Sequence, residues 1–367
     1  GTNRNSRNWL ALTSGKWMVT KLLGVDSKGE YAYFEASKES PLERHIYSVN
    51  IDNGDIKKLS SDQGTHMAIF NSTFSHFIDA YSSTTVPKRI LIKNHKGDQI
   101  KMLLDAPNPL SDYVLGETSI FPIINEGTVL YCRMITPPNY DKTKKYPVVV
   151  YVYGGPHAQM ISNSWLAGSN LWMQLMAQKG YIVFTLDNRG SSNRGHEFES
   201  ATHRQLGTLE MEDQLAGVNY LKNLPYVNPD RMAVHGWSFG GFMTTSMMTR
   251  MPGIFQVGVA GGPVIDWKLY EIMYTERYMD TPEENPEGYA KANLRDFTGA
   301  ITDYTKAITL NSAADFKRTN VFDFIHTSTD KNSAWVTYRL NSTMTRDGKH
   351  TMIQWLETVE LAKQKIT

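Results

Sequence analysis

Apolar and polar residues alternate in short runs over the first 110 residues of the chain. The runs that share this alternation are EYAYFEAS, HIYSVNID, IKKLSS, MAIFNSTF, HFIDAYSS and RILIKNH. Asn53–Gly54 and Lys96–Gly97 are tight-turn signals between them. A period of two with tight turns predicts antiparallel strands, and no run is long enough for a helix. We therefore expect residues 1–116 to form four-stranded units like the blades of a β-propeller, too few to close a ring.

The pattern changes at about residue 117, where longer apolar runs alternate with helical periods. The run YPVVVYVYGGP at 146–156 is continuous and β-branched, which is typical of a strand buried on both faces. Further expected strands are YIVFTLDNRG, RMAVHGWSFGG and FQVGVAGGPV, and the expected helices between them are LWMQLMAQKG and LEMEDQLAGVNYLKNL. This alternation predicts a doubly wound, mostly parallel α/β sheet over residues 117–294. Within it we expect EMED at 210–213 to be a solvated helix face.

The segment 295–367 has a third texture, and two interpretations of it stay open. Apart from the strand-like VFDFIH at 321–326, its runs look helical: GAITDYTKAITLN, DKNSAWVTYRLNSTM and TMIQWLETVELAKQKIT. Ala and Tyr recur 34 residues apart, at Ala300 and Ala334 and at Tyr304 and Tyr338, which is the tetratricopeptide period. The tail is therefore expected to be either an atypical, tetratricopeptide-like helical segment or a diverged hydrolase ending.

Composition narrows the classes of protein without naming one. The 367 residues carry 38 Lys and Arg against 37 Asp and Glu, so nothing predicts nucleic acid as a partner. No apolar run approaches the roughly 18–20 residues that span a bilayer. The single cysteine, Cys132, is expected to be a small buried hydrophobe. The opening GTNRNSRNWL has neither Met nor an apolar leader, so we expect a longer protein whose targeting region is not present.

The stretch HGWSFGG at 235–241 carries the candidate chemistry. It is a G-x-S-x-G motif with Ser238 at its centre, an expected strand before it and an expected helix after it. In this context the serine sits on a strained strand-to-helix turn, and backbone N–H groups at the helix start can bind an oxyanion. The motif predicts a nucleophilic serine at residue 238.

HGWSFGGFMT resembles the prolyl oligopeptidase family of serine peptidases, and within it the dipeptidyl peptidase IV branch of bacterial type. The resemblance covers about residues 10–294 and extends to VYVYGGPHAQ, FTLDNRGSSNRG, HRQLGTLEMEDQ, AGGPVIDW and YTERYMDTPEENPEGY. It implies a β-propeller followed by an α/β-hydrolase domain, with no cofactor or metal. It also implies release of N-terminal Xaa-Pro or Xaa-Ala dipeptides through an acyl-enzyme, a homodimer and a location outside the cytoplasm.

The resemblance also implies roles for single residues. Ser238 is the nucleophile, and the Tyr153 hydroxyl with the Phe239 backbone N–H forms the oxyanion hole. The slot for a proline ring is lined by Val264, Trp267, Tyr270 and Tyr274, and the last three share one face if VIDWKLYEIMY is helical. In DNRGSSNRG, Arg189 and Arg194 are expected to hold a loop by ion pairing.

The acid and the base of the triad are the weak part of the resemblance. FIHTSTDKN at 324–332 is loosely similar to the acid-bearing segment, which makes Asp330 the acid and Asn332 a substrate-side residue. No later segment matches the base, and His350 lies nearer to Asp330 than the family spacing allows. We therefore expect weak or no activity. The alternative is a non-catalytic binding protein, or a truncated or fused fragment, with a helical-repeat interaction tail.

Overall fold

The computed structural model describes residues 11–294, 317–329, 333–346 and 349–362. The chain divides into two compact units, one ending at Phe297 and the other beginning at Thr298. Each unit is described by itself below.

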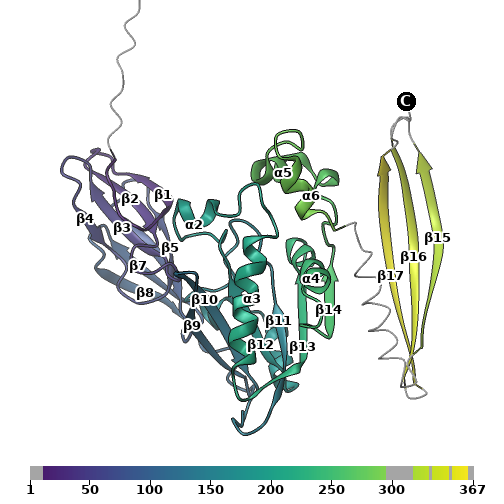
Figure 1. Cartoon of the computed structure of the whole chain (residues 1–367). Helices are drawn as coiled ribbons and strands as arrows, with labels where there is room; N and C mark the ends of the chain where they lie inside the picture. Colours follow the sequence, from purple (N-terminus) through teal and green to yellow (C-terminus); the bar gives the residue numbers. More distant parts are fainter. Residues whose placement is uncertain (1–10, 295–316, 330–332, 347–348, 363–367) are drawn as a thin grey trace, which may run out of the picture. The chain divides into compact units, whose positions relative to one another are not determined.

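Two four-stranded antiparallel sheets form the N-terminal part (Figure 1). The first is β1 (Val19–Val25), β2 (Tyr31–Ala36), β3 (His45–Asn50) and β4 (Ile56–Lys58). The second is β5 (Thr65–Phe70), β6 (His76–Ser82), β7 (Arg89–Asn94) and β8 (Gln99–Asp105). In each sheet the strands are neighbours in chain order, because every connection is a short loop. This meander is the propeller-like pattern that the alternating sequence predicts.

A six-stranded sheet follows, with the order β14-β13-β11-β12-β10-β9. Its strands are β9 (Glu117–Asn125), β10 (Thr128–Thr136), β11 (Tyr146–Tyr151), β12 (Ile182–Asp187), β13 (Val227–Trp237) and β14 (Val257–Gly261). The four strands β12, β11, β13 and β14 pair in parallel, while β9 and β10 add to the edge in antiparallel pairing. The sheet is therefore a doubly wound α/β sheet with the expected mostly parallel centre.

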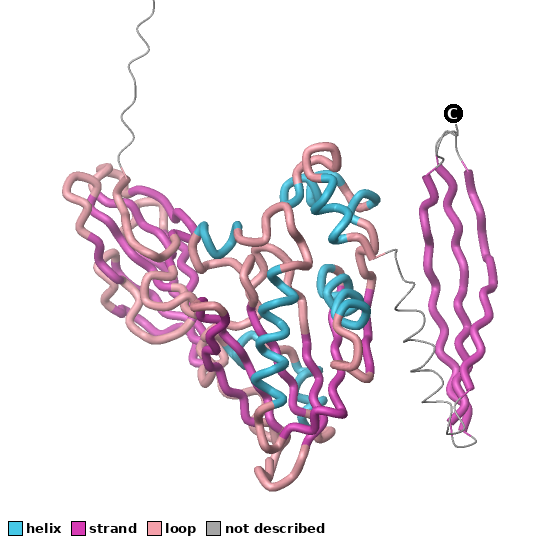
Figure 2. Tube along the Cα trace, viewed as in Figure 1, coloured by secondary structure: helices cyan, strands magenta, loops and turns pink. Residues whose placement is uncertain are grey.

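Helices cover both faces of this sheet. The helices of this part are α1 (Leu171–Gln178), α2 (His196–Ser200), α3 (Leu209–Lys222), α4 (Phe239–Arg250), α5 (Ile272–Met279) and α6 (Pro286–Ala292). On β12, Val183 packs with α1, whereas its neighbour Phe184 belongs to the larger core beneath α3 and α4. Figure 2 shows helices in front of the strands of this sheet and behind them. Successive strand residues point to opposite faces, so α1 lies on one face and α3 and α4 on the other. In the described part of the chain, no helix is long and apolar enough to cross a membrane.

The expectation that EMED is a solvated face is wrong for three of its four residues, since Met211 is buried as well as two of the carboxyl groups. Glu210 and Asp213 on α3 are fully buried. Asp213 accepts hydrogen bonds from the Arg189 side chain and, at 2.8 Å, from the Arg189 backbone N–H. Glu210 accepts from the backbone N–H groups of Gly207 and Thr208 at 3.0 and 3.1 Å. Buried carboxyl groups need such partners, and those of Asp213 come from a loop 24 residues away, which helical periodicity cannot reveal.

Burial raises the pKa of the Glu210 carboxyl to about 8, against the smaller lowering effect of its backbone hydrogen bonds. The folded chain keeps this proton at pH values where the unfolded chain has lost it, so the stability contribution falls as the pH rises from about 4.5 to 8. Across this window we expect the unsubstituted chain to lose on the order of 4 kcal/mol of unfolding free energy. Glu210→Gln mimics the protonated group, so we expect this variant not to show the loss. Urea unfolding at pH 5 and pH 8 measures it.

The matched control is Glu212→Gln on the same helix. The Glu212 side chain is 51% exposed and lies 3.7 Å from Arg189, so its removal should leave the pH dependence of unfolding almost as it is in the unsubstituted chain. Equal pH slopes for Glu210→Gln and Glu212→Gln would contradict the assignment of a neutral, buried carboxyl to Glu210.

Where the structure describes it, the second unit is a three-stranded antiparallel sheet and not a set of helices. It consists of β15 (Lys317–Thr329), β16 (Ser333–Arg346) and β17 (Lys349–Ala362), in chain order. The strand expected at VFDFIH is confirmed within β15, but the helices expected for DKNSAWVTYRLNSTM and TMIQWLETVELAKQKIT are wrong where the structure describes them. SAWVTYRLNSTMT is rich in β-branched and aromatic residues, which favour strands when a partner strand is present.

The correction removes the tetratricopeptide-like interpretation over these residues. Tetratricopeptide units are helix pairs, whereas Tyr338 on β16 pairs with Phe324 on β15 and Glu357 on β17. The expected helix GAITDYTKAITLN, and with it Ala300 and Tyr304, lies outside the described residues.

Candidate active site

Ser238 stands at the sharp turn between β13 and α4. β13 ends at Trp237 and α4 begins at Phe239, so Ser238 is the residue that caps the helix. Its backbone has φ 59° and ψ −117°, a conformation that side-chain-bearing residues rarely adopt. The turn is held from both sides, because the Ser238 N–H donates to Gly261 O at 2.8 Å and Ser238 O accepts from the Phe242 N–H at 3.0 Å. Strain of this kind is typical of a catalytic residue that the surrounding fold holds in place.

The two flanking glycines are required by close packing. A Cβ on Gly236 would lie 2.3 Å from Val152 O and 2.4 Å from Gly240 O. A Cβ on Gly240 would likewise lie 2.3 Å from Val152 O. The elbow therefore packs against the residues just after β11 at a distance that only glycine allows. A Cβ on Gly240 would also lie 3.1 Å from the Cα of Tyr153, so the first turn of α4 lies next to Tyr153.

Tyr153 and Phe239, the two expected oxyanion donors, lie beside each other at the start of α4. Phe239 is the first residue of α4, so its N–H has no partner within the helix. The rings of Tyr153 and Phe239 lie 6.2 Å apart, and the Tyr153 hydroxyl interacts with that of Tyr274. Burial raises the pKa of Tyr153 above its ordinary value, so the phenol keeps its proton at neutral pH and can donate a hydrogen bond to an oxyanion.

The residues expected to line the proline slot converge on Trp267. Trp267 is buried, and its ring lies 5.4 Å from Phe239, 5.6 Å from Tyr270 and 6.0 Å from Tyr274. The Tyr274 ring is stacked on Trp267, while Tyr270 meets both rings edge-on. Val264 is 8% exposed and belongs to the same core cluster. The chain therefore brings Trp267, Tyr270 and Tyr274 together beside the residue that follows Ser238, and it buries Val264 in the same large core.

The single helix expected to align these aromatic residues is not present. Trp267 lies in a short 3₁₀ turn, Trp267–Leu269, and Tyr270 is extended, with φ −85° and ψ 168°. α5 begins only at Ile272, so Tyr274 alone is helical. The rings meet because the extended residue turns the chain between two short helical pieces, a geometry that spacing at i, i+3 and i+7 does not encode.

One aromatic residue of this cluster was missed by sequence analysis. Tyr278 lies 4.9 Å from Tyr274, ring to ring, and 5.6 Å from the His157 ring. Its signal was available, because Tyr278 follows Tyr274 by four residues and the two share a face of α5. Tyr278 extends the aromatic wall to the loop that carries His157.

Two arginines fix the loop 187–195 to the neighbouring elements of the hydrolase part. Arg189 is ion-paired with Asp213 at 2.8 Å, as expected. Arg194 is held differently, with its guanidinium 4.3 Å from the Phe198 ring centre and 5.2 Å from that of Tyr131, and it donates to Val129 O.

Cys132, on β10, is fully buried, and burial raises the pKa of its thiol, so it is the inert small residue that was expected.

The remaining triad candidates are not joined to this site by any described contact. Asp330 and Asn332 lie outside the described residues. His350 is the second residue of β17, in the second unit, where it pairs with Thr345. Over the described part of the chain, no hydrogen bond connects the Ser238 hydroxyl to an imidazole. The roles of Asp330, Asn332 and His350 therefore stay predictions.

Comparison with known proteins agrees with this geometry. The model of the Prolyl oligopeptidase family matches residues 168–357, just over half of the chain, and the model of the Dipeptidyl peptidase IV (DPP IV) N-terminal region matches residues 2–88. The first match runs past Leu294, where the resemblance seen in the motifs ends.

Single relatives show the same similarity. Human Dipeptidyl peptidase 8 is 34% identical over 76% of this chain. The structure of a "putative dipeptidyl aminopeptidase IV" from Bacteroides ovatus is 42% identical, with a TM-score of 0.74 over 82% of this chain and 46% of that one. Porphyromonas gingivalis dipeptidyl peptidase 4 is 31% identical, with a TM-score of 0.73 over the same shares. The chain spans about a third of the length of the curated relatives it matches.

Proposed function

The chain belongs to the prolyl oligopeptidase family, and from that premise we propose that it carries the nucleophile, oxyanion hole and proline pocket of a dipeptidyl-peptidase-type serine peptidase. The observation that supports the proposal best is the meeting of Ser238, Tyr153 and Phe239 at one strained elbow beside an aromatic slot. A packing turn rich in glycine has no need of a strained serine or of a phenol beside the first turn of the helix.

The pocket supports the substrate class. A slot walled by Trp267, Tyr270, Tyr274 and Val264 is flat and apolar, so it favours a rigid apolar ring such as that of proline, or the small side chain of alanine. The names of the relatives place their action at dipeptides. For this chain we accordingly propose peptides with proline or alanine as the second residue. A homodimer and a location outside the cytoplasm belong to the same proposal.

The chemistry is an acyl transfer to serine. The Ser238 hydroxyl attacks the carbonyl carbon of the proline, and the proton of the hydroxyl must pass to a base. The carbonyl oxygen becomes negative and is bound by the Tyr153 hydroxyl and the Phe239 N–H. The amine leaves with a proton, and water then hydrolyses the ester to release the dipeptide and restore the serine. In this reaction Ser238 is the nucleophile, and Tyr153 and Phe239 are the oxyanion donors.

A dipeptide boronic acid ending in boroproline tests the proposal without depending on turnover. Serine adds to the boron to give a tetrahedral adduct that resembles the transition state and binds more tightly than substrate. We expect Ala-boroproline to bind the chain and Ser238→Ala to lose this binding by more than about 100-fold, measured by calorimetry.

Two controls make the result specific. Ser246→Ala, on the adjacent helix, should leave the affinity unchanged. A boronic acid with a phenylalanine side chain in place of the proline ring should bind at least about tenfold less tightly, because the slot is too small for it. Absence of binding, or equal binding by Ser238→Ala, would favour the alternative of a non-catalytic binding protein or fragment, although the helical-repeat tail of that alternative is already excluded over β16 and β17.

A further inference from the structure

The segment from Tyr153 to Asn163 connects the oxyanion tyrosine to the N-terminal sheets. Its first half is tied to the hydrolase part, because the Ala158 N–H donates to Gly155 O and the His157 N–H donates to Gly190 O at 2.8 Å. The N–H groups of the next residues, Met160 and Ile161, donate to the two carboxylate oxygens of Asp187 at 2.9 and 3.0 Å. These bonds tie residues 157–161 of the segment to the loop that begins at Asp187.

Arg44 fixes the other side through Gln159. Arg44 lies just before β3, and its guanidinium donates to Gln159 Oε1 at 2.5 Å. The same oxygen accepts from the Asn193 side-chain amide at 2.8 Å, and the Gln159 amide nitrogen donates to Pro41 O at 2.8 Å. Burial lowers the pKa of Arg44 to about 10, so it stays charged at neutral pH and its hydrogen bond to the amide is charge-assisted.

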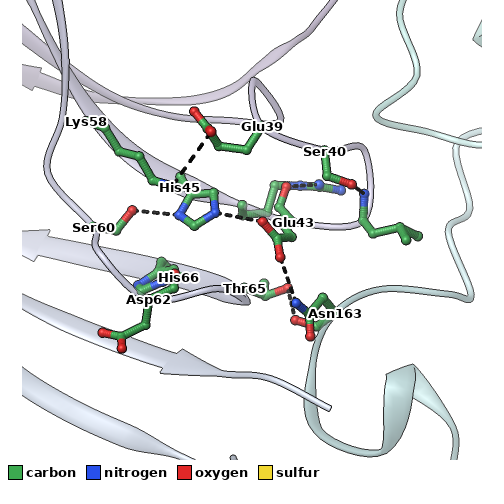
Figure 3. A network of polar contacts seen from close by, with 12 residues as sticks. Glu39, Ser40, Glu43, His45, Lys58, Ser60, Asp62, Thr65, His66 and Asn163 are labelled. Atoms are coloured by element: carbon green, nitrogen blue, oxygen red, sulfur yellow. Dashed lines mark hydrogen bonds and ion pairs between the residues drawn. The ribbon is translucent and has the colours of Figure 1, made fainter. Parts of the chain in front are cut away.

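A second attachment is made by Glu43 and Asn163, drawn in Figure 3. Glu43 accepts from the Asn163 side chain at 2.7 Å through one oxygen and lies 2.9 Å from the His45 ring through the other. The Asn163 backbone N–H donates to Leu42 O at 2.7 Å, and its carbonyl accepts from the Thr65 hydroxyl. Both attachments start from residues 41–44, so one short loop of the N-terminal sheets holds both ends of the segment 159–163.

We infer that residues 41–44 position the segment that carries Tyr153, with Arg44 acting as a positioning residue through Gln159. The turn closed by Gly155 and Ala158 is the only chain between Gln159 and Tyr153, so displacement of Gln159 is transmitted to the oxyanion donor. The N-terminal sheets thereby contribute to the arrangement of the active site. The catalytic consequence rests on the proposed function, whereas the positioning itself does not.

Hydrogen–deuterium exchange measures the positioning directly. In Arg44→Met we expect the amides of residues 157–163 to exchange about tenfold faster or more, which corresponds to losing one charge-assisted hydrogen bond. The strand β12 and the helix α4 should keep their exchange rates, because their hydrogen bonds do not depend on Arg44. Arg89→Met is the matched control, since Arg89 pairs with Asp105 at an exposed site of the second sheet.

A double-substitution cycle separates action through Gln159 from a general loss of stability. Gln159→Met should raise exchange at 157–163 at least as much as Arg44→Met does, because it also removes the bonds to Asn193 and Pro41, and the double variant should exchange no faster than Gln159→Met alone. Arg44→Lys should restore part of the protection. Unchanged exchange at 157–163 in Arg44→Met, additive effects in the double variant, or faster exchange throughout the domain would each overturn the inference. Ala-boroproline affinity, measured in parallel, tests the proposed function separately.

Discussion

The chain is expected to release p-nitroaniline from Gly-Pro p-nitroanilide at a rate barely above that of its Ser238→Ala variant. Ser238 has the strained elbow and the oxyanion donors, but attack on an amide also requires a base to take the serine proton. No segment after Asp330 matches the family's base, and His350 departs from the family spacing. Peptidases that lose a triad member keep only about 10³–10⁴ of acceleration over water, from the oxyanion hole and binding. Steady-state turnover of the amide is the measurement.

Substitution of His350 completes this experiment. His350→Ala should leave the residual rate unchanged, as should His95→Ala, a control at a turn of the second sheet. Robust turnover that is abolished by both Ser238→Ala and His350→Ala would show that His350 serves as the base, and the prediction of weak activity would then be wrong.

The second large effect is expected from Tyr153. Tyr153→Phe removes only the hydroxyl that would bind the oxyanion, and loss of one such donor costs about 10²–10³ in transition-state stabilisation. The boroproline adduct places a negatively charged boronate at the same position, so we expect the affinity of Ala-boroproline to fall by about that factor. The measurement works even where turnover is slow, because it needs no proton transfer to a base.

Tyr151→Phe is the control, at the last residue of β11 and two residues before Tyr153. The Tyr151 ring lies against Trp172 and His235 and packs on the core beneath α1, whereas Tyr153, beyond the end of β11, packs on the larger core, so the Tyr151 hydroxyl should not affect boronate binding. If Tyr153→Phe binds Ala-boroproline as well as the unsubstituted chain does, Tyr153 is a packing residue and the oxyanion assignment fails.

The sequence by itself was sufficient for the sheets before residue 294 and for the elbow. The β-branched run at 146–151, the helical period after it and the glycines around Ser238 are local features that act within a few residues, so they survive without knowledge of the fold. The resemblance of the motifs to the prolyl oligopeptidase family added the candidate pocket residues, and the structure brings these together.

Tertiary structure alone decided how the charges and the rings are used. Asp213 is buried because Arg189, 24 residues earlier, turns back to pair with it, and Arg44 reaches Gln159 across 115 residues. Trp267 and Tyr274 stack because an extended residue between two short helices redirects the chain.

The same limit explains the wrong helices in the tail. Residues 333–346 contain the β-branched and aromatic side chains of a strand, but a strand gains its hydrogen bonds only from partners, here residues as far away as Ser333 and Ala362. Helical hydrogen bonds close within four residues, so their pattern is readable from the chain. The sequence determined the features that close locally. The tertiary structure decided strand pairing, buried ion pairs and the convergence of side chains, because each depends on residues brought together from far apart in the chain.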